Sequence, residues 1–116
     1  MLIEEKARLF KALSDPGRLR ILKMLQKRML CVCEITEILG LATSTVSEHL
    51  SILKRAAFIL EEKDGKWVNY KLNPHPSDPA VVSMLAMLPY ILSDDPVSGS
   101  DIEKIDAVDR VKLCSK

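Results

Sequence analysis

The sequence predicts a mainly α-helical domain with one small β-hairpin, and three observations support this class. Apolar residues recur at helical spacing in successive segments between residues 2 and 56. Two short runs rich in β-branched and aromatic residues follow, joined by an Asp-Gly dipeptide, which is a strong hairpin signal. The chain of 116 residues suffices for one domain, but at this size a partner subunit would help to bury apolar surface.

The first two helices are expected over residues 2–13 and 16–27. The first segment places apolar side chains around one face, with charged residues between them. Ser14 or Asp15 can cap the second helix, and Pro16 then takes its first position, where a missing N–H costs little. The sequence therefore predicts two consecutive helices separated by a sharp break.

A third, short helix is expected over residues 32–39, and a fourth follows it. Gly40 is placed to end the third helix in the left-handed conformation. Thr43 or Ser44 can cap the fourth helix, which continues toward Ala56. Two helices joined by a turn that contains Gly form a helix-turn-helix, whose second member is built to lie in the major groove of DNA.

A β-hairpin is expected directly after the helix-turn-helix. Its strands are the runs 58–62 and 66–72, which Lys63, Asp64 and Gly65 join. An Asp-Gly pair suits a turn whose two central positions need positive φ. A hairpin appended to a helix-turn-helix is a wing, so the predicted architecture is a winged helix-turn-helix.

The segment after the hairpin predicts a fifth helix and a tail. Asp78 and Pro79 can open a helix that continues to residue 92 and is apolar around most of its circumference. Such a helix needs burial on two sides, so we expect a homodimer through the fifth and N-terminal helices. We interpret residues 93–99 as a linker before a short helix that begins with a capping box at residue 100. The expected division is a DNA-binding and dimerisation domain over residues 1–92 and a C-terminal tail over residues 93–116.

The charge of the chain is unevenly distributed. Residues 1–72 hold thirteen Lys and Arg against nine Asp and Glu, whereas residues 73–116 hold four against seven. This basic excess agrees with a nucleic-acid partner but is too small to indicate one by itself. The longest apolar run is too short to cross a bilayer and no secretory signal is found, so we expect a cytoplasmic protein, in a compartment that keeps thiols reduced.

Three segments of the chain together resemble the ArsR/SmtB family of metal-sensing repressors. They are a Ser-Asp-Pro helix start within residues 13–22, a Cys-Val-Cys-Glu run within residues 30–35 and a Val-Ser-Glu-His-Leu helix within residues 45–54. The resemblance implies a homodimeric winged-helix repressor that binds double-stranded operator DNA. The Cys-Val-Cys-acidic run is similar to the arsenic-responsive branch, which implies release from DNA by trivalent arsenic or antimony, or else by cadmium or lead, with no organic cofactor.

Cys31, Cys33 and Cys114 are the candidate metal ligands. Soft thiolates select thiophilic metals and metalloids over hard ions. Cys31 and Cys33 lie too close in sequence for an unstrained mutual disulfide, so we expect free or ligating thiols. Lys27, Arg28 and the start of the third helix are expected to lower the pKa of these thiols.

The spacing of the two neighbouring cysteines suggests a switch. Residues two apart on a helix do not face one another, so an ion that takes both sulfurs would distort the start of the third helix. Because the fourth helix packs against the third, that distortion would displace the DNA-reading surface. Cys114 could complete a three-sulfur site by folding back, from the same or the partner subunit.

The predicted DNA surface consists of short polar side chains on the fourth helix and of basic side chains beside them. Side chains of the first kind can reach base edges and phosphates, and those of the second kind can bind phosphates. The candidates are Ser44, Thr45, Ser47, Glu48, His49, Ser51, Lys54, Arg55, Lys63 and Lys66. We favour Ser44, Thr45, Ser47 and His49 for direct contact, and expect His49→Ala to harm operator binding more than binding to random DNA.

Two other functions are compatible with the same residues. The first is a redox or reactive-sulfur sensor of the same fold, in which the thiols oxidise or form a bridge, for example between Cys33 and Cys114. The second is a small thiol enzyme, such as an arsenate-reductase-like protein that uses Cys31 as its nucleophile. No Cys-x-x-Cys pair and no Gly-rich phosphate loop accompanies the thiols, so we do not expect an enzyme.

Overall fold

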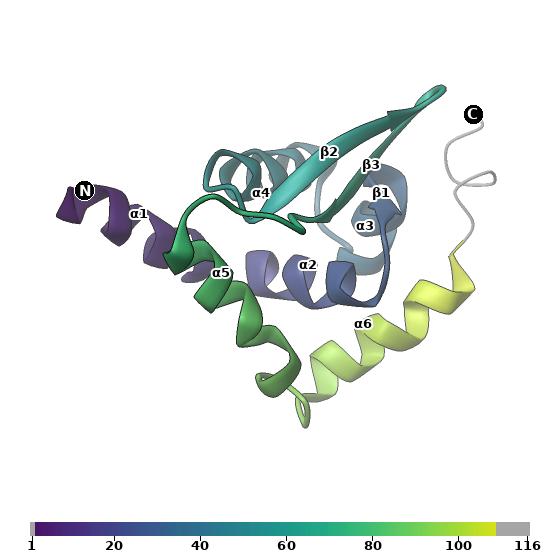
Figure 1. Ribbon diagram of the computed structural model, residues 1–116. Coiled ribbons are helices and arrows are strands. Elements are labelled where there is room, and N and C mark those ends of the chain that lie inside the picture. The colour runs from purple at the N-terminus through teal and green to yellow at the C-terminus, as the bar shows by residue number, and fades with distance from the viewer. Residues whose placement is uncertain (1, 109–116) are drawn as a thin grey trace.

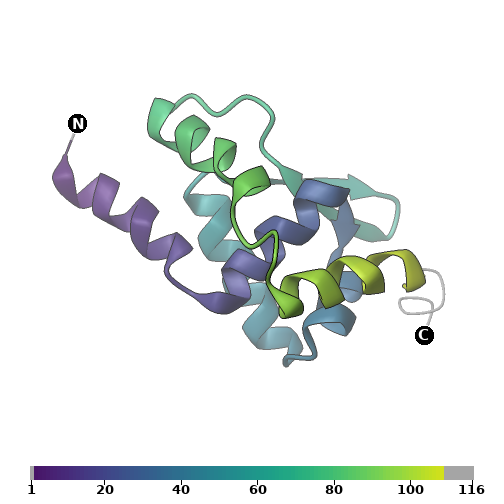
Figure 2. The same cartoon turned by 90° about the horizontal axis from the view of Figure 1, so that it is seen from below.

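The computed structural model describes residues 2–108 and places α2 (Pro16–Lys27) at the centre of the domain (Figure 1). The other helices surround it: α1 (Ile3–Leu13), α3 (Val32–Leu39), α4 (Thr43–Arg55), α5 (Pro79–Ala86), the 3-10 turn η1 (Leu88–Tyr90) and α6 (Pro96–Ala107). Ile21, Leu22 and Met24 of α2 are fully buried. In both views α1 and α5 lie at the end of the molecule away from the hairpin tip (Figures 1 and 2).

The helix boundaries predicted from capping residues are confirmed for α2 and α3. The Asp15 side chain accepts a hydrogen bond from the backbone N–H of Arg18, and Pro16 opens the helix. Gly40 ends α3 with φ of 68°, a conformation that costs glycine little. The expected cap of α4 is wrong, because Ala42 takes the N-cap position and no side chain caps this helix.

The wing is part of a three-stranded antiparallel sheet, of which the sequence predicted two strands. β2 (Ile59–Asp64) and β3 (Trp67–Leu72) form the expected hairpin, and β1 (Leu30–Cys31) pairs with the other edge of β3. The turn residues are Gly65 and Lys66, of which only Gly65 has positive φ, so the expected Asp-Gly turn centre is wrong by one residue. With two residues, β1 is too short to produce a periodic pattern.

The fifth helix is shorter than the sequence suggested. α5 ends at Ala86 and the chain continues as the 3-10 turn η1, which contains Pro89. Proline has no backbone N–H to donate, and its ring disfavours helical geometry in the residue before it, so the α-helix cannot continue to residue 92. Val81 and Met84 face the core, whereas Val82 and Met87 are exposed.

The segment after residue 92 contains a full helix rather than a long linker. α6 begins at Pro96, with Asp95 as its N-cap, so the expected linker over residues 93–99 and the helix start at residue 100 are wrong. The helix packs against α2 and α3, and Ile105 is completely buried. Whether residues 93–116 behave as a tail separate from the domain stays a prediction.

A buried ion pair fastens α6 to α2. Arg20 donates from Nε and Nη2 to the two carboxylate oxygens of Asp101, each at 2.9 Å, and the Asp101 side chain is 2% exposed. This contact raises the pKa of Arg20 above its usual value. A bidentate pair of this kind is stronger than a single contact between mobile surface charges.

Removing the positive partner of this pair should destabilise the domain. We expect Arg20→Met to lower the free energy of unfolding by about 2 kcal/mol, because it leaves a buried carboxylate without its counter-charge while keeping most of the apolar stem. Urea unfolding followed by circular dichroism measures the change. Lys71→Met, which breaks the exposed pair with Glu62, is the matched control and should cost less than about 1 kcal/mol; equal losses in the two variants would contradict the prediction.

Candidate thiol site and nucleic-acid interface

Cys31 occupies the junction between the wing sheet and α3. Its backbone pairs with Asn69 of β3, and the next residue, Val32, begins α3. Its side chain is 1% exposed and sits beside the apolar core. A change at Cys31 therefore affects both the wing sheet and α3, the helix that precedes α4.

Cys31 and Glu34 cap the start of α3 reciprocally. The Glu34 Oε1 atom accepts from the backbone N–H of Cys31 at 2.9 Å, and the Cys31 sulfur faces the backbone N–H of Glu34. Glu34 is buried, and Arg28 donates both to its Oε2 atom at 3.2 Å and to the Ile105 carbonyl of α6 at 3.0 Å. The thiol segment is thus connected through Glu34 and Arg28 to the C-terminal helix.

The structure contradicts the expectation of a lowered pKa at Cys31. Burial raises the pKa of this thiol, the backbone N–H groups of Glu34 and Cys33 lower it, and the nearby Glu34 carboxylate raises it again. Arg28, which was expected to favour the thiolate, is bound to Glu34 instead. The net shift is upward, so the thiol form is favoured near neutral pH.

Cys33 lies in the first turn of α3, partly exposed, and is disulfide-bonded in the structure. The expectation of free or ligating thiols is therefore wrong for Cys33 in this state. Within residues 2–108 no group of three or more His, Cys, Asp or Glu side chains is arranged to hold a metal ion. The third candidate ligand, Cys114, lies outside the described residues.

The polar residues predicted to face DNA lie on one exposed stretch of α4, with one exception. All of them except His49 are exposed, while Val46 and Leu50 between them are buried and anchor the helix. The exposed set is Ser44, Thr45, Ser47, Glu48 and Ser51. The His49 side chain is 12% exposed and lies against the start of α2.

The basic side chains predicted to bind phosphates are exposed, but they differ in the contacts that they make within the protein. Lys54 pairs with Glu61 of β2 at 2.8 Å, a contact that raises the pKa of Lys54 and joins the end of α4 to the wing. The Lys66 ammonium lies 5.0 Å from the centre of the Trp67 ring at the hairpin tip. Arg55 donates to the Ser51 carbonyl on its own helix at 3.4 Å, and Lys63 is exposed on β2.

Large exposed apolar side chains gather on α1 and on the α5 segment. They are Ile3, Phe10, Val82, Met87 and Tyr90. An ion pair between Lys6 of α1 and Asp78, the N-cap of α5, holds these two helices side by side (Figure 2). A chain of this size rarely leaves such a set of large apolar side chains open to water without a partner.

The sequence analysis did not predict the roles that the structure gives to Arg28 and Glu34 at the candidate thiol site. The spacing Cys31-x-x-Glu34 has the form of a capping box in which cysteine replaces serine or threonine, so a signal for Glu34 was present. No comparable signal pointed from Arg28 to α6, because that contact depends on how distant segments pack.

In the described part of the chain, five α-helices around α2, a helix-turn-helix of α3 and α4, and a three-stranded sheet that contains the wing hairpin define a winged helix-turn-helix protein. Residues 15–59 match the family described as bacterial regulatory protein, arsR family. The chain is 41% identical over 68 residues to the arsenical resistance operon repressor of Escherichia coli, covering 58% of each chain. It is also 44% identical over 68 residues to an uncharacterized HTH-type transcriptional regulator of Methanocaldococcus jannaschii, covering 58% of this chain and 76% of that one.

The fold also matches solved structures. Reduced HlyU from Vibrio cholerae superposes with a TM-score of 0.64 and 30% sequence identity, over 78% of this chain and 90% of that one. The chain belongs to the arsR family of bacterial regulatory proteins, whose members named above are transcriptional regulators rather than enzymes. Within residues 2–108 no helix is long and apolar enough to span a membrane.

Cys31 should be protected from alkylation in the folded protein. Burial and a raised pKa both lower its reactivity, so we expect iodoacetamide at pH 7.5 to modify Cys31 at least tenfold more slowly in buffer than in 6 M urea, roughly as reactivity follows the thiolate fraction and access. Peptide mass spectrometry of the reduced protein measures both rates.

The pH dependence provides a second check on the same thiol. Because its folded pKa is raised, the rate in the folded protein should keep increasing above about pH 8.5, the ordinary thiol pKa at which the unfolded chain begins to level off. Equal rates and equal pH profiles in the two states would contradict the placement of Cys31.

Proposed function

We propose that this protein is a DNA-binding transcriptional repressor that leaves its operator when the Cys31–Cys33 segment takes up a thiophilic ligand, with trivalent arsenic or antimony as the first candidates. One observation carries the proposal: Cys31 is at once a strand partner of the wing and the N-cap of α3. The similarity to an arsenical resistance operon repressor supports the choice of ligand. Such a repressor acts in the cytoplasm, where its DNA lies.

The DNA interface follows from the exposed polar stretch of α4. Ser44, Thr45 and Ser47 lie at its N-terminal end, the end that contacts base edges when a recognition helix enters the major groove. Glu48 and Ser51 extend the same stretch. Lys54, Arg55, Lys63 and Lys66 would bind phosphates on either side.

A homodimer would place two such interfaces on one DNA molecule. The apolar side chains exposed on α1 and α5 give a surface for pairing two copies, and a symmetric dimer reads an inverted repeat. Burial of Phe10 and Tyr90 in that contact would remove a large apolar area from water.

Release would start at the cap of α3. A ligand bound to the Cys31 sulfur requires the thiolate and draws the sulfur out of its buried position, so the backbone N–H of Glu34 loses its acceptor. Movement at Cys31 also strains its pairing with Asn69 of β3. Because α3 packs against α4, the recognition helix and the wing would both change position.

A titration of the DNA complex tests this proposal. Arsenite, antimonite, cadmium, lead and zinc are added separately to the reduced protein on DNA selected from a random pool, and release is followed by fluorescence anisotropy. Cys31→Ser and Cys33→Ser should lose release by the active ion while still binding DNA, since serine can cap α3 in place of the Cys31 sulfur. Cys114→Ser shows whether a third sulfur takes part. If every variant releases DNA as the wild type does, the thiols have no role in sensing.

The disulfide at Cys33 favours a second candidate, a thiol-oxidation sensor of the same fold. Two thiols would lose two electrons and two protons to a peroxide, which is reduced to water or an alcohol. DNA affinity is compared after treatment with a phosphine reductant and after mild peroxide, with mass spectrometry to identify the oxidised cysteines. If peroxide changes the DNA affinity and none of the ions does, redox sensing replaces metal sensing as the proposed function.

A basic residue at the wing tip should contribute to binding without reading sequence. We expect Lys66→Ala to weaken binding by a similar factor on selected and random DNA, and to reduce the slope of log affinity against log salt by about one. Anisotropy at several salt concentrations measures both effects. Lys104→Ala, on the exposed side of α6, removes the same charge away from the proposed interface and is the control; equal effects of the two variants would rule out a wing contact.

A further inference from the structure

His49 differs from its polar neighbours on α4 because it is held from within the protein. Its Nδ1 atom lies 3.2 Å from Nη1 of Arg18, and its Nε2 atom lies 3.6 Å from Oδ2 of Asp15. A guanidinium only donates, so Nδ1 acts as the acceptor and the ring hydrogen lies on Nε2, facing Asp15. Both ring nitrogens therefore face α2 rather than solvent.

The sequence makes room for this ring at Gly17. A Cβ atom at position 17 would lie 2.9 Å from His49 Nε2 and 3.1 Å from its Cδ2, closer than side-chain atoms tolerate. Burial would raise the pKa of Asp15, but the backbone N–H groups of Arg18 and Gly17, the nearby imidazole of His49 and the guanidinium of Arg18 outweigh it and lower that pKa. Four residues thus form one contact, the Arg18–His49 bridge: Asp15, Gly17, Arg18 and His49.

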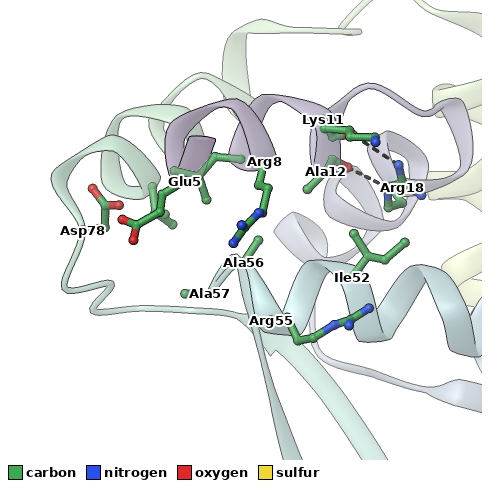
Figure 3. A pocket seen from close by; sticks show the side chains of 12 residues that line it. Glu5, Arg8, Lys11, Ala12, Arg18, Ile52, Arg55, Ala56, Ala57 and Asp78 are labelled. Carbon is green, nitrogen blue, oxygen red and sulfur yellow. Dashed lines mark hydrogen bonds between the residues drawn. The ribbon is translucent and has the colours of Figure 1, made fainter. Parts of the chain in front are cut away.

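Arg18 extends this bridge to α1. Its Nε donates to the Ala12 carbonyl at 2.7 Å and its Nη2 to the Lys11 carbonyl at 3.2 Å, at the C-terminal end of α1 (Figure 3). The carbonyls at a helix C-terminus carry partial negative charge and favour a cation. A single guanidinium therefore joins the last turn of α1 to the middle of α4.

Beyond the bridge α1 and α4 face each other across a hollow. This space of about 740 Å³ is lined by α1, by the C-terminal part of α4 and by the start of α5, with Arg18 at one end (Figure 3). Side-chain packing across the hollow is therefore incomplete, and the Arg18 guanidinium joins the two helices at its edge.

We infer that His49 is a positioning residue, which through the Arg18–His49 bridge fixes α4 relative to α1 and so sets the spacing of DNA half-sites that the dimer accepts. This inference rests on the proposed function, since α1 would pair the two copies and α4 would enter the groove. It replaces direct base contact as the role of His49. The distance between two recognition helices determines which half-site spacing fits.

Thermal unfolding tests the contact itself without DNA. Gly17→Ala should lower the melting temperature of the wild type, because the new Cβ collides with the His49 ring. It should lower it clearly less, or raise it, in the His49→Ala background, where only the contact with Asp15 Oδ2 at 3.1 Å opposes the gain in helix propensity. Gly99→Ala, in α6 with open space around the new atom, is the matched control and should raise it in both backgrounds. An equal effect of Gly17→Ala in the two backgrounds would overturn the bridge.

Selection from a random DNA pool tests the role in spacing. We expect His49→Ala to lower affinity about tenfold or more on all sequences, to keep the half-site bases that the wild type selects, and to lose the preference for one half-site spacing. His49→Gln, which keeps an acceptor for Arg18, should recover part of the preference. Ser47→Ala serves as the comparison for a base-reading residue and should change the selected bases instead.

The outcomes separate this inference from the proposed function. A change of base preference in His49→Ala, with spacing preference intact, would show that His49 reads bases and would overturn the positioning role. Failure of the wild type to select any DNA would overturn the proposed function and the spacing role with it. The melting temperatures of Gly17→Ala in the two backgrounds would still decide whether the Arg18–His49 bridge exists.

Discussion

The reciprocal cap between Cys31 and Glu34 is the interaction on which the thiol site, the wing and the helix-turn-helix all depend. Cys31 must remain buried to keep its sulfur at the start of α3, and its backbone must remain extended to pair with Asn69. Serine is the usual residue for such a cap, but it lacks affinity for soft ions. Under the proposed function, cysteine at this position would combine a structural task with a chemical one, and a bound ligand would satisfy the second only at the expense of the first.

Three arginines tie α2 to its neighbours, and one of them, Arg28, binds the Glu34 side of that cap. Arg18 joins α2 to α1 and to His49 of α4, Arg20 holds α6 through Asp101, and Arg28 joins Glu34 to the last turn of α6. Each places a planar, multiply donating group at the boundary between α2 and a neighbour, where a lysine ammonium lacks the fixed fork that makes bidentate contacts. The elements around α2 are consequently tied by polar contacts as well as by the apolar core, so a displacement at α3 can be transmitted to α6.

The sequence predicted most of the fold because local signals decide it. Asp followed by Pro opens α2, α5 and α6 alike, yet the third occurrence, Asp95-Pro96, was overlooked because serine and glycine after it suggested a linker. β1 could not be predicted, since two residues carry no period and their pairing with β3 is a long-range contact. The raised pKa of Cys31 was missed for a related reason: Arg28 is close in sequence, but folding directs its charge to Glu34.

The same distinction explains why His49 was grouped with the exposed residues of α4. Sequence spacing places it near Glu48 and Ser51, but neighbouring residues on a helix point about 100° apart. A polar residue among exposed ones can therefore face inward if a hydrogen-bond partner lies on the adjacent helix. That partner is 31 positions earlier, and the room for the ring comes from the missing side chain at Gly17. A histidine on such a helix therefore predicts a DNA contact only after the charges and glycines of the preceding helices have been considered, because the part-buried contact with Arg18 turns both ring nitrogens toward α2.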